Sequence, residues 1–289
     1  MKMTRREMLA TTGAGICAAG MPITSFAKSK KKVKIALQLY SVRKHCGENF
    51  DKTLEEVAAM GFDGVEFAGF YNYSDKPEEL KNKLENIKLE IAGSHVGGMD
   101  FRPHKIGSRL DYHKKLGCKY MICPGHRDAC NPQKYKDFAQ LMIGAQKRLK
   151  EHGMYTGFHN HAHELKKVDG KSFWEHFADT TNDEMVLQQD VGWTTYAGVD
   201  PVPLIKKYPG RSKTVHFKPT VIKGASDRKP IIGKDSVDWN PIIKACYDIG
   251  GTEWFIIEQE RYVPGKTPLE CAEMSFKALK SILKEMKKI

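Results

Sequence analysis

One pattern repeats along the chain beyond its first thirty residues: a short apolar run, a loop, and a longer stretch with the periodicity of an amphipathic helix. Short apolar runs without alternation are typical of strands that are buried on both faces, as in parallel sheets. We expect eight such strands, at Val33–Leu39, Gly64–Phe67, Glu90–Ser94, Lys119–Cys123, Tyr155–His159, Met185–Asp190, Lys213–Phe217 and Trp254–Glu258. The expected helices are Phe50–Met60, Pro77–Ile87, Lys105–Leu116, Tyr135–His152, Ser172–Thr180, Pro201–Lys207, Pro241–Ile249 and Pro268–Lys287.

This alternation predicts the α/β fold class and, within it, a single (β/α)8 TIM barrel. The structural alternative is a doubly wound open sheet, which typically carries a glycine-rich phosphate turn after its first strand. The segment Leu37–Arg43 has no such turn, so the barrel is preferred. Glycines that end helices just before a strand support the same reading. They are Gly61, Gly117, Gly153 and Gly250.

The first 27 residues have the order of an export signal. Arg5 and Arg6 precede a stretch of apolar and small residues, and Ser25-Phe26-Ala27 offers a cleavage site, so the segment resembles a twin-arginine signal. A membrane anchor is the alternative, but glycine, threonine and proline interrupt the stretch, and a span needs about 20 apolar residues. We therefore expect a signal peptide at 1–27, a barrel domain at 28–289, and a periplasmic protein without stable membrane insertion.

The formal net charge of +12 raises the question of a nucleic-acid partner. The lysines, however, are scattered over predicted helices, as Lys81, Lys83, Lys277 and Lys280 illustrate, and form no groove interleaved with aromatic residues. Solvated helix faces explain such a distribution. We expect a small carbohydrate as the partner and no nucleic acid, while a homo-oligomer stays open.

Acids and imidazoles gather where the predicted strands end. In a TIM barrel, functional groups collect at the C-terminal ends of the strands. Because such groups are costly to bury without partners, their common position argues for a shared ligand. The charged and imidazole residues at these ends are Glu66, His95, His159, His161, Glu164, Asp190, His216, Lys218 and Glu258.

Carboxylates combined with one or two imidazoles suit a divalent ion such as Mn²⁺, Mg²⁺, Co²⁺ or Zn²⁺. Such an ion can bind neighbouring oxygens of a sugar and stabilise the enediolate that forms when a proton leaves the carbon beside a carbonyl. The expected reaction is isomerisation or epimerisation of a sugar or keto-sugar, and β-elimination by a 3-keto-glycoside lyase is the alternative. No glycine-rich anion cradle is evident, which favours a non-phosphorylated substrate.

Several segments resemble the sugar phosphate isomerase/epimerase family, which belongs to the xylose isomerase-like TIM-barrel superfamily. They are LQLYSVR (37–43), MGFDGVEFAG (60–69), GFHNHAHEL (157–165), QQDVGWTTYAGVDP (188–201), KYPGR…VHFK (207–218) and FIIEQE (255–260). The resemblance spans the mature chain in order. It implies a metal, with Mn²⁺ the first expectation, held by acids from strands five, six and eight and by a histidine from strand seven. These ligands would be Glu164, Asp190, His216 and Glu258.

The chain departs from the family pattern at two places. Relatives carry the strand-five acid within the strand, where this chain has His159, and Glu164 lies five residues further on. Either Glu164 reaches back, or a histidine replaces it; His159 and His161 share a strand face and are the candidates. Relatives also commonly have an aspartate after the strand-seven lysine, where Pro219 stands here, which implies an altered substrate pocket.

The rim residues divide into two expected roles. Those expected to move protons are Glu164, Glu258, His161 and Lys218. Those expected to contact substrate are Glu66, His95, His159 and Trp193, the last by stacking on a sugar face. Ordinary alternatives are a solvated loop for Glu164, an ion pair for Lys218 and plain packing for Trp193. Other histidines are expected on the surface: His104, His113, His126 and His152.

Two other function classes compete with an isomerase. A metal-dependent endonuclease would use the same barrel superfamily and the basic charge, but the scattered lysines and the export signal argue against it. A non-catalytic sugar-binding barrel would need to have lost its chemistry, whereas the ligand residues implied by the resemblance are all present.

Overall fold

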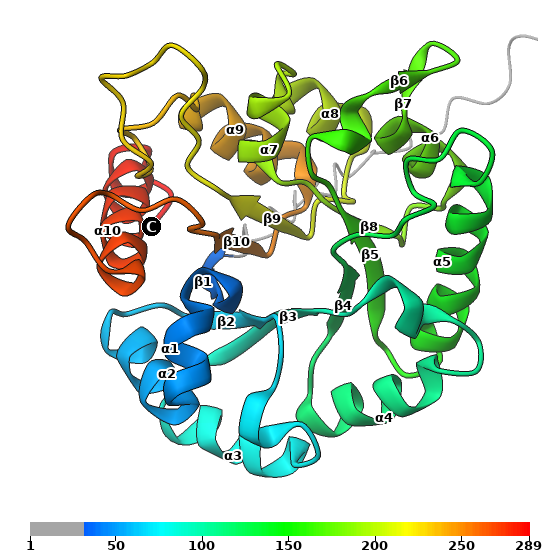
Figure 1. Ribbon diagram of the computed structural model, residues 1–289, viewed down its shortest axis with the longest axis horizontal. Coiled ribbons are helices and arrows are strands. Elements are labelled where there is room, and N and C mark those ends of the chain that lie inside the picture. Colours follow the sequence, from blue (N-terminus) through cyan, green and yellow to red (C-terminus); the bar gives the residue numbers. More distant parts are fainter. Residues whose placement is uncertain (1–31) are drawn as a thin grey trace, which may run out of the picture. The chain divides into compact units, whose positions relative to one another are not determined.

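The computed structural model of the protein describes residues 32–289, in which a ring of parallel strands is surrounded by helices (Figure 1). The predicted signal peptide lies outside the described residues. The barrel strands are β1 (Lys34–Gln38), β2 (Gly64–Phe67), β3 (Glu90–His95), β4 (Tyr120–Cys123), β5 (Tyr155–His159), β8 (Val186–Gln188), β9 (Thr214–Phe217) and β10 (Trp254–Ile257). Each coincides with a predicted strand, and the predicted TIM barrel is confirmed.

The strands pair in the order β8-β5-β4-β3-β2-β1-β10-β9, which leaves β8 and β9 as the two ends of the sheet. A parallel bridge between Asp190 and His216 joins these ends. The backbone N–H of His216 donates to the carbonyl of Gln189 at 2.9 Å across the same junction. The barrel therefore closes at two residues that were predicted as metal ligands.

The predicted helices are also present, within a few residues of the expected bounds. They are α2 (Phe50–Ala59), α3 (Pro77–Asn86), α4 (Ile106–Leu116), α5 (Tyr135–Lys150), α6 (Phe173–Thr180), α8 (Pro201–Lys207), α9 (Trp239–Ala245) and α10 (Pro268–Glu285). Elements not predicted are α1 (Arg43–Glu48), α7 (Val191–Tyr196) and the small hairpin β6 (Lys167–Val168) and β7 (Lys171–Ser172). Short 3-10 turns lie at Leu39–Val42, Tyr71–Tyr73, Gly98–Phe101 and His163–Leu165, and a π-helical turn lies at Cys246–Gly250.

The glycine predictions hold at three positions and fail at one. Gly61, Gly117 and Gly153 have the positive φ of a left-handed cap, but Gly250 does not; Gly251 takes that role with φ 66°. The reason is the π-helical turn Cys246–Gly250, which carries the helix one residue further than the α-helical pattern implies.

Alternation along the strands decides what fills the barrel, because successive side chains point to opposite faces. Ala36, Val186 and Ile256 pack together in one buried cluster. Two residues further along the same three segments stand Gln38, Gln188 and Glu258, all buried. The barrel interior is therefore apolar in its middle and polar at the C-terminal ends of the strands.

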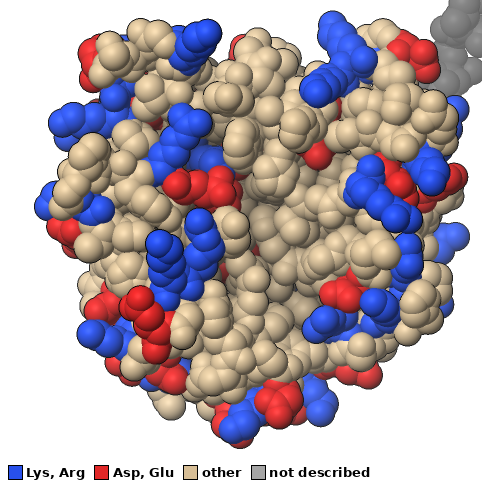
Figure 2. Space-filling view, in the orientation of Figure 1, with Lys and Arg blue, Asp and Glu red and all other residues tan. Residues whose placement is uncertain are grey.

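Charged side chains are spread around the edge of the face seen in Figure 2, where lysine and arginine alternate with acids and the centre is largely uncharged. This face carries no continuous basic patch, in keeping with lysines that lie on solvated helix faces. Across residues 32–289, no helix combines the length and the apolar character that crossing a bilayer requires.

Two histidines that were expected on the surface have side chains that neighbouring residues cover. His113 on α4 is 1% exposed, and its ring packs against Phe70 and Tyr112. The side chain of His126 is 4% exposed and stacks on Phe138. His113 lies on a helix and His126 lies in a loop. Whether such a position is buried depends on the elements that pack against it, and the local sequence pattern does not reveal this.

Candidate metal centre and active site

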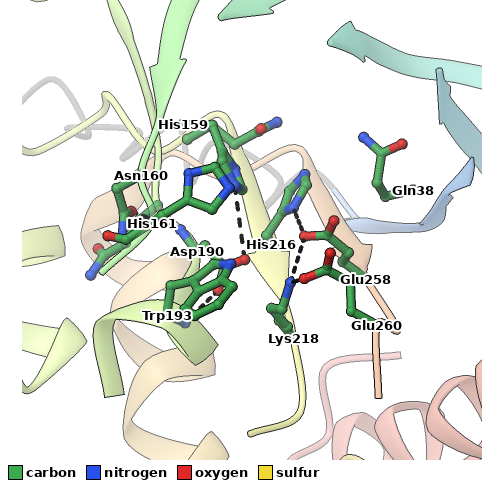
Figure 3. A network of polar contacts seen from close by, with 12 residues as sticks. Gln38, His159, Asn160, His161, Asp190, Trp193, His216, Lys218, Glu258 and Glu260 are labelled. Atoms are coloured by element: carbon green, nitrogen blue, oxygen red, sulfur yellow. Dashed lines mark hydrogen bonds and ion pairs between the residues drawn. The ribbon is translucent and has the colours of Figure 1, made fainter. Parts of the chain in front are cut away.

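Four buried side chains converge where β5, β8, β9 and β10 end (Figure 3). They are His159, Asp190, His216 and Glu258, and each offers a ligand atom within 4.8 Å of the others. Each strand end contributes one residue of this group, which we call the metal-capable group. Three of its members were predicted as metal ligands, while His159 was predicted to contact substrate and noted as a possible substitute for Glu164.

Asp190 is placed by its role at the start of α7. Its Oδ1 accepts the backbone N–H of Trp193 at 2.7 Å, and its own N–H donates to Asn160 Oδ1 at 2.9 Å. An aspartate in this position caps the first turn of a helix, which fixes the direction of its side chain. Burial raises the pKa of Asp190 to about 7, although Lys218 opposes the shift.

His216 lies between two carboxylates. Its Nε2 is 2.6 Å from Glu66 Oε2 and its Nδ1 is 3.0 Å from Glu258 Oε2. Burial lowers the pKa of His216, but the carboxylates of Glu66 and Glu258 outweigh burial and raise it to about 10. Both ring nitrogens face carboxylates, which holds the ring in one orientation. To bind a metal ion the ring must give up one proton, so that one nitrogen ligates while the other keeps its N–H···carboxylate hydrogen bond.

Glu66 lies in β2 beside His216 and is fully buried. It accepts hydrogen bonds from Gln38 Nε2 at 2.6 Å and from Gln188 Nε2 at 2.7 Å. Burial raises its pKa, but the neighbouring His95 and His216 reverse the effect and leave the pKa lowered. Glu66 was predicted to contact substrate, whereas here its described partners are side chains of the barrel interior.

His95 faces the same interior from β3. Its Nε2 is 2.7 Å from Gln188 Oε1, and its ring stacks on that of His216 with centroids 5.1 Å apart. Burial lowers the pKa of His95, against the opposing charge of Glu66. The amides of Gln38 and Gln188, which donate to Glu66, were not predicted, although a glutamine inside an otherwise apolar strand is a visible signal.

Lys218 follows β9 and points at two acids (Figure 3). Its Nζ is 3.4 Å from Glu258 Oε2 and also pairs with Glu260, and it lies 4.9 Å from the centre of the Trp193 ring. Burial raises the pKa of Glu258, but Lys218 and then His216 outweigh it and leave the pKa lowered. Glu260, two residues beyond Glu258, had been given no role.

His161 and Glu164 lie in the loop after β5. Glu164 Oε2 accepts the backbone N–H of His161 at 2.8 Å, and Glu164 is not a member of the metal-capable group. The ring of His161 contacts His159 and Trp193, with centroids 5.0 and 5.7 Å away. Burial lowers the pKa of His161, so its imidazole is neutral near pH 7 and can accept a proton.

A pocket of about 400 Å³ opens beside the metal-capable group, within the size range of small-molecule sites. Its lining combines candidate site residues with loop residues: Tyr40, Ala68, His95, Gly97, Pro124, His159, His161, Glu258 and Glu260. A larger hollow lies elsewhere, between α2 and the start of α10, and contains none of the predicted site residues. The pocket beside the metal-capable group is therefore the one that the site chemistry can use.

The fit of a divalent cation can be judged from atoms that lack a partner. Within the described chain, Asp190 Oδ2 is buried without a hydrogen-bond partner, and it faces His159 Nε2 at 3.9 Å (Figure 3). A buried carboxylate oxygen left alone is costly, and a cation removes that cost. Two carboxylates and two imidazoles are also a donor set that borderline divalent ions accept. The residues present therefore fit a divalent metal ion.

Comparison with known proteins agrees with this architecture. A model of the xylose isomerase-like TIM barrel family matches residues 54–282, and the chain belongs to that family. This confirms the resemblance seen in the sequence.

Among its relatives is inosose dehydratase from Clostridium perfringens, 24% identical over 80% of this chain and 89% of its own length. The solved structure of a sugar phosphate isomerase/epimerase from Parabacteroides distasonis superposes with a TM-score of 0.73 at 23% identity, covering 86% of this chain and 98% of its own. The IOLI protein, solved with a zinc atom, superposes at 0.66 with 14% identity, covering 88% and 99%. Both the dehydratase and the isomerase/epimerase are enzymes, which act on inosose and on sugar phosphates, respectively.

Proposed function

We propose that the protein is a divalent-metal-dependent enzyme that removes the proton beside a carbonyl group of a non-phosphorylated sugar or keto-sugar. The observation that carries the proposal is the metal-capable group at the mouth of the barrel, next to a pocket of about 400 Å³. Neither the net charge of +12 nor the pocket alone would identify a chemistry. The combination of buried ligands, a neutral imidazole and an ammonium group does.

The residues that would hold the ion are His159, Asp190, His216 and Glu258. We infer that His159 takes the place of Glu164, because Glu164 is engaged by the backbone of His161. When bound, the ion would draw electron density from substrate oxygens and so make the neighbouring C–H group more acidic. Mn²⁺ stays our first expectation, with Mg²⁺, Co²⁺ and Zn²⁺ as alternatives.

Two side chains at the pocket are suited to moving protons. His161 lines the pocket as a neutral imidazole and can accept the proton from carbon. Lys218 presents an ammonium group that is fixed between Glu258 and Glu260 and can donate a proton to a departing oxygen. Glu164 positions His161 by holding its backbone N–H, which is a role distinct from ligation.

Isomerisation, epimerisation and β-elimination all begin with this proton removal. We favour elimination, because it uses one base and one acid, and the site offers both. The inosose dehydratase relatives support this preference, since a dehydratase performs an elimination. Epimerisation would require a second group to return the proton on the opposite face of the sugar, and L-ribulose 3-epimerase is among the structures that share the fold.

Metal analysis of the purified protein tests the proposal first. We expect about one divalent ion per chain in the wild type and its loss in Asp190→Ala and His216→Ala. Asp183→Ala and His152→Ala, which change exposed residues of the same types, should retain the ion. Exchange of the α-proton of keto-sugars in D₂O, followed by NMR, should then depend on the ion. A wild type that takes up no ion after reloading with Mn²⁺ would contradict the proposal.

A further inference from the structure

Tyr40 lines the pocket beside the metal-capable group, and no role had been predicted for it. It lies in the 3-10 turn that follows β1 and is 42% exposed, although the residues on either side of it are buried. The other aromatic rings in this lining are the imidazoles of His95, His159 and His161. Trp193, from which stacking on a sugar was expected, lies outside the lining described for this pocket. Tyr40 is therefore the carbon-ring surface that the pocket presents to a ligand.

One face of the Tyr40 ring is covered by a cation. The guanidinium group of Arg43 lies over the ring, 4.1 Å from its centre. Arg43 Nη1 also donates to the carbonyl of Tyr40 at 2.8 Å, so the guanidinium group is fixed to the backbone of the residue whose ring it covers. A cation held over one face favours a single orientation of the ring. The opposite face is the one that remains free to receive a ligand.

The backbone of Tyr40 is fixed relative to the metal-capable group. Its N–H donates to Gln38 Oε1 at 3.1 Å. Gln38 Nε2 donates to Glu66 at 2.6 Å, and Glu66 is in turn 2.6 Å from Nε2 of His216. The next residue, Ser41, is held from another side, because its Oγ accepts a backbone N–H of the loop after β10 at 2.8 Å. Consecutive hydrogen bonds therefore connect the Tyr40 ring to a member of the metal-capable group.

We propose that the reacting sugar stacks on the free face of Tyr40 and is bound as a closed six-membered ring. The C–H groups on one face of such a ring form an apolar surface that matches an aromatic face, whereas an open-chain sugar has no flat face to stack. The pocket of about 400 Å³ is large enough for the ring. The carbonyl group beside which the proton is removed is then a member of the ring. This inference rests on the proposed function for that carbonyl group, and it makes Tyr40 a determinant of specificity and Arg43 a positioning residue.

The binding of two polyols without a carbonyl group tests this proposal. 1,5-Anhydroglucitol is a closed ring, and glucitol has the same configuration at the corresponding carbons in an open chain. Calorimetry on the purified protein with Mn²⁺ present measures the Kd of each. The wild type should bind the closed ring about fivefold more tightly, which corresponds to about 1 kcal/mol. Tyr40→Ala should make the two Kd values equal, and Tyr40→Phe, which keeps the ring, should preserve the preference. Arg43→Ala, which frees the ring, should lower the preference about twofold.

Tyr196→Ala is the matched control, since Tyr196 is also an exposed tyrosine but lies outside the lining described for this pocket. It should keep the wild-type preference. Equal binding of the two polyols by the wild type, or a preference that Tyr40→Ala leaves unchanged, overturns the proposal. A Tyr40-dependent preference in a protein that takes up no ion and exchanges no α-proton would retain the stacking site and reject the proposed function. Metal-dependent exchange without a preference for the closed ring would do the reverse.

Discussion

Glu66 accepts hydrogen bonds from three side chains that belong to three different strands, β1, β8 and β9. Its carboxylate is fully buried, so its partners cannot be replaced by water without rearrangement. Through His216 it determines which way a ring of the metal-capable group faces. A residue of this kind affects a metal site without touching the metal.

We therefore expect the replacement of Glu66 to lower the affinity for the metal ion. Glu66→Gln keeps the size of the side chain but removes the charge that orients His216, and we expect Mn²⁺ to bind about 10–100-fold more weakly. Competition with a chelator of known affinity measures the change. Glu90→Gln, which alters an exposed acid at the start of β3, is the control. Equal affinities in the wild type and Glu66→Gln would show that Glu66 does not act on the site.

The sequence predicts those site residues that directly end a strand. Asp190 and His216 meet across the barrel closure because the C-terminal ends of parallel strands share one rim. The choice between His159 and Glu164 is different, since it depends on how the loop after β5 folds. Asn160 connects that loop to the start of α7, because its Oδ1 accepts a hydrogen bond from the N–H of Asp190. This contact joins distant segments, so no local sequence pattern predicts it. The ligand role of either residue stays a prediction until metal binding is measured.

At the scale of elements, α4 carries a buried histidine, His113, whose protonation should affect stability rather than the active site. His113 donates from Nδ1 to the carbonyl of Arg109 at 2.6 Å, and burial lowers its pKa from 6.5 to about 4. Between these two pH values, the unfolded chain holds a proton that the folded chain does not. The free energy of unfolding must therefore fall as the pH drops through this window, and His113 contributes no pH dependence above it.

We expect His113→Leu to remove this contribution. The wild type should lose up to about 3 kcal/mol of stability relative to the variant between pH 6.5 and pH 4. Urea unfolding of both proteins across this range measures the difference, and the variant's own pH dependence accounts for all other groups. A constant difference between the two proteins from pH 7 to pH 4 would mean that the pKa of His113 is the same in the folded and the unfolded chain.

The elements that escaped prediction share a physical reason. α1 and α7 are each six residues long, less than two turns, so neither shows a full period of apolar residues. α7 exists because Asp190 caps it and the end of the barrel supports it. The strands, in contrast, could be predicted because both of their faces are buried. Such strands appear in the sequence as apolar runs, whatever conformation the loops adopt.

At the scale of the whole molecule, the chain joins a catalytic barrel to an N-terminal segment with the features of an export signal. We propose that residues 1–27 direct the folded protein to the periplasm, since paired arginines are typical of a pathway read by that signal. A barrel whose first and last strands pair, β1 with β10, must have most of its chain present before it can close. Export after folding suits such a topology.

Changing Arg5 and Arg6 to lysine tests the export proposal. In a Gram-negative host, the wild type should occur as a shortened protein in the periplasmic fraction, while the double variant should stay full-length in the cytoplasm. Cell fractionation with immunoblotting measures both. Changing Lys30 and Lys31 to arginine, a matched conservative pair beyond the expected cleavage site, should leave the distribution unaltered. Identical distributions of wild type and double variant would contradict the proposal.

The bridge between Asp190 and His216 joins the two end strands of the sheet and so closes the barrel. The same two residues would bind the ion, so metal binding and barrel closure are coupled. An ion bound only to the folded chain adds about 2.7 kcal/mol at a hundredfold excess over its Kd. Chelation should therefore lower Tm by roughly 5–10 °C in the wild type and leave Asp190→Ala unaffected. Metal supply would then govern the lifetime of the protein as well as its rate. In a metal-poor medium, the chains that persist would be those able to react.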